Sequence, residues 1–130
     1  MSPLRVSFCL DHEALEGLLF QQLKAWNAYR NNQFILYFWR SRGGIEVDFI
    51  LYGEDGIFAF EVKNSGKIRN QDLRPLLEFR SDYPESHAIF LYRGKERLLR
   101  GKILCIPVDE FLHRLDPDKA MKLILSGSDL

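Results

Sequence analysis

Residues 43–63, GGIEVDFILYGEDGIFAFEVK, decide the fold of this 130-residue chain. Two apolar, β-prone runs flank a short turn that begins and ends with glycine, which is the pattern of a β-hairpin. If Gly53 pairs with Gly56, then Asp48 lies directly across from Glu61 on the neighbouring strand. The stretch therefore predicts two antiparallel strands that bring two carboxylates together inside an apolar part of the chain.

A turn centred on Asp55-Gly56 is the alternative, and it places Asp48 across from Lys63. Because side chains alternate between the two faces of a strand, both registers leave the same charged residues on one face. That face carries Glu46, Asp48, Glu61 and Lys63. The opposite face is apolar and predicts the core, with Ile45, Val47, Phe49, Leu51, Phe58, Phe60 and Val62.

Two carboxylates directly opposed on a sheet repel each other by about 3 kcal/mol at ~5 Å and an effective dielectric constant near 20. A divalent cation removes this repulsion, because its oxygen ligands lie only a few ångström apart. Lys63, two residues beyond Glu61, can neutralise charge, position a water or hold a phosphate. The spacing thus suits metal-assisted attack on a phosphodiester. A solvated charge ladder with a Glu46–Lys63 ion pair is the alternative reading of the same residues.

Further segments extend the pattern along the chain in a fixed order: LEGLLF at 15–20, LYFWR at 36–40, GIEVDF at 44–49, FEVKNS at 60–65, DLR at 72–74, FLYRG at 90–94 and IPV at 106–108. They cover most of residues 13–113. The chain resembles the PD-(D/E)xK nuclease superfamily in its acidic residue on one strand and its E-x-K on the next. It resembles more closely the domain of unknown function that follows the ATPase module in many bacterial and archaeal AAA-type ATPases.

This resemblance implies an α/β, restriction-endonuclease-like αβββαβ core, with a mixed sheet flanked by helices. It implies the catalytic residues Asp48, Glu61, Lys63 and Glu16. Mg²⁺ or Mn²⁺ would be bound by Asp48, Glu61 and the backbone carbonyl of Val62, with Glu16 and Glu46 as further candidates. The substrate implied is DNA, with RNA left open, and the candidate nucleic-acid contacts are Arg40, Arg42, Lys67 and Arg74. An AAA-type ATPase module, in cis or in trans, is the implied protein partner.

The remaining patterns predict the other elements of the fold. We expect a helix over about 11–31 with Asp11 as N-cap, and strands at 34–40 and 87–92, the latter parallel to the third strand. A helix over 70–83 contains Pro75, which suits a helix that begins near Asp72. An edge strand at 102–107, able to pair with another copy, precedes a helix at 108–115 and one more turn or two at 119–125. We expect a leader at 1–10, one domain at 11–115, and an extension at 116–130 with a frayed tail.

Composition narrows the classes of function. The chain has 18 basic and 18 acidic residues, so it is not polybasic, although residues 61–102 carry an excess of positive charge. This excess predicts either a phosphate track beside the site or ordinary solvated charge. Two separate cysteines and three scattered histidines predict no zinc, and the lack of a phosphate-cradling glycine loop predicts no nucleotide cofactor and no ATP hydrolysis.

No apolar run is long enough for a membrane span and no signal-peptide pattern opens the chain, so we expect a cytoplasmic protein. It would be an excised domain or a free-standing derivative. Two other functions remain open: a catalytically silent module that binds nucleic acid or docks protein, and a structural partner for an ATPase.

Overall fold

The computed structural model describes residues 11–127, which form ten elements. They are α2 (His12–Tyr29), β1 (Phe34–Arg40), β2 (Glu46–Gly53), β3 (Gly56–Val62), α3 (Asn70–Asp82), β4 (His87–Tyr92), β5 (Leu98–Arg100), β6 (Ile103–Pro107), α4 (Val108–Arg114) and α5 (Met121–Ser126). The strands form one mixed sheet in the order β1-β2-β3-β4-β6-β5. The predicted αβββαβ order and the mixed sheet flanked by helices are confirmed.

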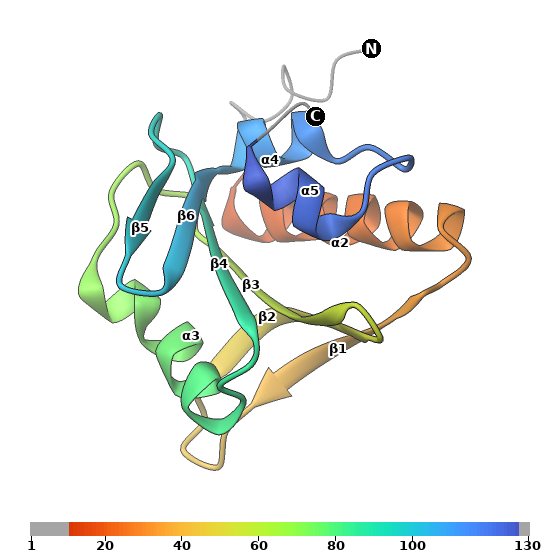
Figure 1. Ribbon diagram of the computed structural model, residues 1–130. Helices are drawn as coiled ribbons and strands as arrows, with labels where there is room; N and C mark the ends of the chain where they lie inside the picture. Colours follow the sequence, from red (N-terminus) through yellow and green to blue (C-terminus); the bar gives the residue numbers. More distant parts are fainter. Residues whose placement is uncertain (1–10, 128–130) are drawn as a thin grey trace.

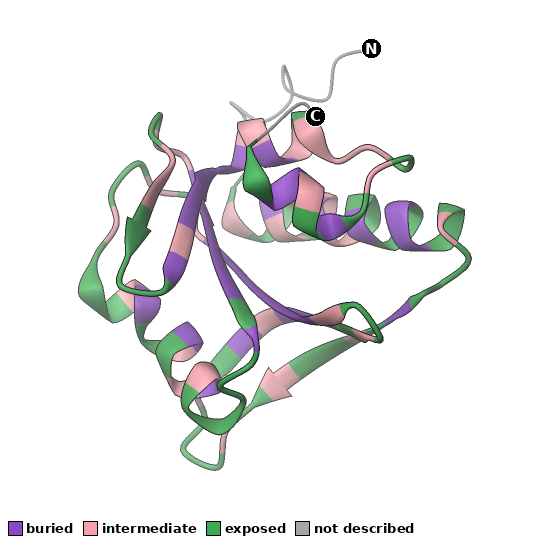
Figure 2. Cartoon of the chain, viewed as in Figure 1, coloured by how far each residue is buried: buried purple, intermediate pink, exposed green. Residues whose placement is uncertain are grey.

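Helices cover the sheet on both faces (Figure 1), with α2, α4 and α5 on one side and α3 on the other. Each face has its own apolar core. The core under α2 includes Leu19, Phe58 and Phe60, whereas the core under α3 includes Leu76 and Phe90. Figure 2 shows the burial that results, with the central strands buried along most of their length. The expectation that one face of the hairpin is core and the other polar was therefore too simple.

The hairpin forms in the first of the two predicted registers. Gly53 pairs with Gly56, and the ladder continues to Phe49 opposite Phe60. Gly56 has φ +135°, a conformation that glycine adopts without steric cost. The tight turn thus fixes which residues of β2 and β3 face one another.

The expected face of β2 is wrong for the residues before Asp48, because the strand contains a bulge. Tyr37 pairs with Ile50 but Trp39 pairs with Val47, so Asp48 and Phe49 together lie opposite Phe38. An extra residue in one strand reverses the faces of the residues beyond it. Val47 accordingly packs in the α3 core and Ile45 is only partly buried.

Helix α2 begins where the sequence predicts and ends slightly earlier. The Asp11 carboxylate accepts a hydrogen bond from the Ala14 N–H at 2.8 Å, as an N-cap does. After Tyr29 the chain turns back through Asn31 and Asn32, both with positive φ. Asparagine tolerates this left-handed region better than most residues, which explains the sharp entry into β1.

Two details of the second half differ from expectation. Helix α3 begins at Asn70, so Pro75 lies in its second turn and the Gln71 carbonyl lacks the usual helical donor. Strand β4 is parallel to β3, as predicted, but β6 is not an edge strand. The short strand β5 is joined to β6 by a turn that contains Gly101 at φ +62°. Strand β5 pairs with β6 and forms the edge of the sheet instead.

The chain after residue 115 contributes to the core. Met121 and Ile124 of α5 are buried in the cluster beneath α2. The expected leader at 1–10 and the last residues of the expected frayed tail, 128–130, lie outside the described residues. Within residues 11–127, no helix has the length and hydropathy that crossing a membrane requires.

Candidate functional site

Asp48 and Glu61 meet where β2 and β3 separate. The strand ladder ends at Phe49 and Phe60, and beyond it the two carboxylates replace backbone pairing. The Asp48 N–H donates to Oε1 of Glu61 at 3.1 Å, and the Val62 N–H donates to Oδ2 of Asp48 at 2.9 Å. Each carboxylate therefore binds the backbone of the opposite strand, next to the bulge that β2 forms at Asp48 and Phe49.

Burial makes negative charge costly at this pair. The Glu61 side chain is nearly inaccessible, and burial, together with the neighbouring Asp48, raises the pKa of Glu61 to about 9. Burial also raises the pKa of Asp48 to about 6, and the Glu16 charge adds to this, while the hydrogen bond from Val62 opposes it. At neutral pH the pair therefore favours a shared proton or a bound cation over two free charges.

An open hollow of about 460 Å³ gathers most of the predicted site residues. Its charged lining comes from α2, β2, β3 and α3, and consists of Glu16, Glu46, Asp48, Glu61, Lys63 and Arg74. We call it the acid pocket. Four separate elements thus bring together side chains that are up to 58 positions apart in the sequence.

Glu46 lies in this pocket with a different partner from the one expected. Its carboxylate accepts a 2.8 Å hydrogen bond from Nε of Arg40, its cross-strand neighbour on β1. The Glu46–Lys63 ion pair of the alternative charge-ladder reading is not among the ion pairs of residues 11–127. The bulge accounts for this, because it changes the face of Glu46 relative to β3.

Sequence reasoning assigned no role to His12 and did not consider Gln71, yet both line the acid pocket. His12 Nε2 lies 2.9 Å from Oε2 of Glu16, one helical turn away. The i, i+4 spacing of His12 and Glu16 on the predicted helix was the available signal. No signal in the sequence pointed to Gln71, since its position depends on how α3 packs against the sheet.

The predicted nucleic-acid contacts are dispersed. Arg74 lines the acid pocket, and Arg40 lines an adjoining hollow of about 370 Å³ that shares Glu16, Glu46 and Asp48 with it. Arg42 is exposed in the loop between β1 and β2. Lys67 is exposed in the loop after β3, where its N–H donates to the Ser65 hydroxyl at 3.2 Å.

The donor set fits a hard divalent cation. Mg²⁺ is commonly bound by one or two carboxylates while it keeps several waters, and Asp48 with Glu61 supplies two carboxylates. Within the described part of the chain, no group of three or more histidine, cysteine or acidic side chains is arranged to chelate a metal. The Val62 group that the structure ties to Asp48 is its N–H, so a role for its carbonyl stays a prediction.

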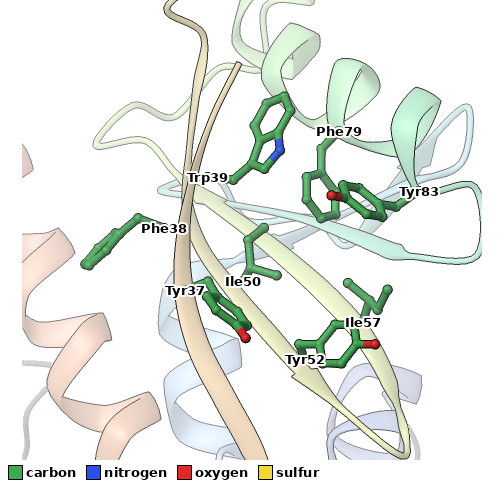
Figure 3. Close-up of a pocket in the computed structure, with 8 residues that line it drawn as sticks. All are labelled: Tyr37, Phe38, Trp39, Ile50, Tyr52, Ile57, Phe79 and Tyr83. Atoms are coloured by element: carbon green, nitrogen blue, oxygen red, sulfur yellow. The ribbon is translucent and has the colours of Figure 1, made fainter. Parts of the chain in front are cut away.

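An aromatic groove lies next to these hollows (Figure 3). It has a volume of about 280 Å³ and is lined by Tyr37, Phe38, Trp39, Ile50, Tyr52, Ile57, Phe79 and Tyr83. The Trp39 ring meets Phe79 edge-on with centroids 5.3 Å apart, and Figure 3 shows Phe38 on the other side of β1. Phe38 and Trp39 also line the hollow beside the acid pocket, so the two surfaces are continuous.

Comparison with known proteins gives one match. The model of a protein family described as "Domain of unknown function (DUF4143)" matches residues 13–111. No curated protein and no solved structure matches the chain.

Proposed function

The chain belongs to the DUF4143 family, a family of unknown function, and we propose from its own site that it is a nuclease-like domain. In this proposal it hydrolyses phosphodiester bonds of DNA with the help of Mg²⁺ or Mn²⁺. The observation that carries the proposal is that the Asp48 and Glu61 carboxylates each accept a backbone N–H of the opposite strand, at the open end of the β2–β3 hairpin beside Lys63. The resemblance to the PD-(D/E)xK superfamily supports it.

The two carboxylates are suited to hold a cation. One oxygen of each carboxylate accepts a hydrogen bond from a backbone N–H of the opposite strand, which holds the two side chains next to each other. The raised pKa values of Asp48 and Glu61 support this role, because a nearby positive charge would favour their ionised forms. A bound divalent ion would polarise the phosphate and make a bound water more acidic.

The surrounding side chains have separate tasks in this proposal. Lys63 lies on the rim of the acid pocket, partly buried, where it orients the attacking water or stabilises charge on the phosphate. Glu16, held by His12, supports the water shell of the cation. Arg74 approaches from α3 and contacts a neighbouring phosphate of the substrate.

Cleavage assays test the activity directly. The protein is incubated with single-stranded, duplex and branched DNA and with RNA, in Mg²⁺ or Mn²⁺, beside Glu61→Gln and Lys63→Ala. We expect cleavage by the wild type and a loss of about a hundredfold or more in each variant. Glu54→Gln, an exposed carboxylate in the hairpin turn, is the matched control and should retain activity. Cleavage that survives both pocket substitutions would refute the assignment.

Calorimetric titration with Mn²⁺ tests the cation site independently of turnover. We expect binding to the wild type and no measurable binding to Asp48→Asn, which keeps the shape of the side chain but removes its charge. Equal binding by the two proteins would place the cation elsewhere.

One observation favours a second function. Among residues 11–127, no third acidic, histidine or cysteine side chain completes a metal-binding group with Asp48 and Glu61. The alternative is a catalytically silent accessory domain of an AAA-type ATPase that binds nucleic acid or docks protein. DNA binding without cleavage under either cation would support this alternative.

A further inference from the structure

Another hollow, of about 310 Å³, lies where β4 begins. Four nitrogen-bearing side chains from four different elements converge on it. Arg80 comes from α3, His87 from the start of β4, Lys102 from the turn between β5 and β6, and Lys122 from α5. We call it the basic pocket. Of the residues that the structure describes, none of those lining it is acidic.

The positive charge of this pocket is not neutralised by ion pairs within residues 11–127. The pairs there are His12–Glu16, Arg40–Glu46 and Arg97–Glu110. The chain as a whole has equal numbers of basic and acidic residues, so three cations around one hollow are a local concentration. The pKa of His87 is consistent with this concentration of charge. Burial lowers it, and the charges of Lys122 and Arg80 lower it further.

Arg80 is fixed in position at the pocket. One of its Nη1 hydrogens is donated to the Ser86 carbonyl, immediately before β4. A guanidinium has five N–H donors, so this bond holds the group in place and leaves other donors for a ligand. A held guanidinium loses less conformational entropy on binding than a mobile one.

An apolar wall completes the hollow. The imidazole of His87 stacks on Phe58, with ring centroids 4.9 Å apart and an interplanar angle of 17°. Leu99 of the edge strand β5 lines the same hollow and is largely exposed. Cations beside an apolar wall are what a small molecule with an anionic end and a planar apolar end requires.

We propose that the basic pocket binds a phosphate-bearing small molecule of the nucleotide class. Arg80, Lys102 and Lys122 bind the phosphate, since a guanidinium and two ammonium groups form short charge-assisted hydrogen bonds to its oxygens. The base lies against the wall formed by Leu99 and the stacked His87.

The basic pocket is distinct from the acid pocket. Its strand pair, Phe58 with His87, is at the first rungs of the β3–β4 ladder, whereas Glu61 is three residues further along, opposite Phe90. The two pockets share no lining residue. The proposal therefore does not depend on the nuclease-like function.

Isothermal titration calorimetry in EDTA tests whether the basic pocket binds nucleotides. The separate ligands are ATP, AMP, inorganic pyrophosphate and a single-stranded oligonucleotide. We expect ATP and AMP to bind the wild type, and ATP to bind more tightly. Lys102→Gln/Lys122→Gln removes two exposed charges and should weaken ATP binding about tenfold or more. Lys24→Gln/Lys95→Gln removes the same amount of charge elsewhere on the surface and should change the affinity for ATP by less than about twofold.

Three results would overturn the proposal: no nucleotide binding at millimolar concentration, equal weakening by both double variants, or binding of the oligonucleotide alone. Glu61→Gln should leave ATP affinity unchanged, which separates this site from the acid pocket. Because both lysines are exposed, the double variant is expected to keep the wild-type melting temperature, and circular dichroism verifies this.

Discussion

At the scale of single residues, Asp48 and Glu61 show what a short sequence pattern can predict and what it cannot. Their proximity follows from counting outward from the Gly53–Gly56 pair, and the structure has that register. The hydrogen bonds that each makes to the opposite backbone were not predictable in this way. They occur where the β2–β3 ladder ends, next to a bulge that depends on how β2 pairs with β1.

Glu61 should cost the protein stability at neutral and alkaline pH. Its pKa is raised from the ordinary 4.5 to about 9 by burial and by Asp48, so the folded chain binds more protons than the unfolded chain within that window. The free energy of unfolding therefore falls as the pH rises through the window, and the loss disappears below about pH 4.5.

Glu61→Gln should raise the melting temperature at pH 8 by several degrees, since about 1 kcal/mol shifts the melting temperature of a domain this size by ~4 °C. Glutamine keeps an oxygen that accepts the hydrogen bond from the Asp48 N–H. Differential scanning calorimetry at pH 8 and at pH 4.5 measures the effect, which should be much smaller at the lower pH. Glu54→Gln is the control. A lower melting temperature for Glu61→Gln at pH 8 would contradict this account.

At the scale of elements, boundaries set by local signals were predicted well. The N-cap Asp11, the left-handed pair Asn31-Asn32 and the glycine turn mark ends that depend on a few neighbouring residues. The bulge opposite Phe38 has no such marker, because no proline or glycine stands at Asp48 or Phe49.

Strand β5 was missed for a related reason. Its three residues, Leu98–Arg100, are too short to show a period, and they form a strand only because β6 offers an unpaired edge. Without β5, the buried strand β6 was assigned to the edge of the sheet.

Asn27 joins α2 to β1, and we expect its substitution to destabilise the protein strongly. Its amide nitrogen donates to the Phe34 carbonyl at 2.8 Å, and its oxygen accepts from the Phe34 N–H at 3.1 Å, both in a buried setting. Asn27→Leu leaves both backbone groups without these partners, so we expect the free energy of unfolding to fall by about 2–4 kcal/mol. Urea denaturation measures this change. Gln22→Leu, exposed on the same helix, should change it by less than about 0.5 kcal/mol.

At the scale of the whole molecule, the C-terminal segment is held to distant parts of the fold. The Trp26 indole donates to the Asp116 and Lys119 carbonyls, each at 3.1 Å. Arg97, just before β5, binds the Glu110 carboxylate at 2.9 Å and the Leu125 carbonyl at 2.5 Å. The Trp26 contacts span 90 and 93 residues of sequence and the Arg97 contacts span 13 and 28, which is why no local pattern predicted them.

Arg97→Ala should loosen α5 while leaving the sheet intact. We expect the free energy of unfolding to fall by about 1–3 kcal/mol, since the substitution removes charge-assisted hydrogen bonds to two elements. Limited proteolysis should cleave after residue 115 faster than in the wild type. Arg100→Ala on β5 loses one exposed hydrogen bond to Asn70 and serves as the control. Equal protease resistance of the two variants would show that Arg97 does not hold α5.

Strand β3 buries every side chain from Ile57 to Val62, and Glu61 is the one ionisable residue in that run. A chain selected for stability alone would have an amide or an apolar residue at this position, because an ionised carboxylate is costly to bury and functional sites commonly reduce stability. Over evolutionary time, mutation should therefore erode the acid wherever selection for its chemistry is relaxed. If the proposed activity is correct, members of the family that lack it should show drift at this position while Phe58 and Phe60 remain large and apolar.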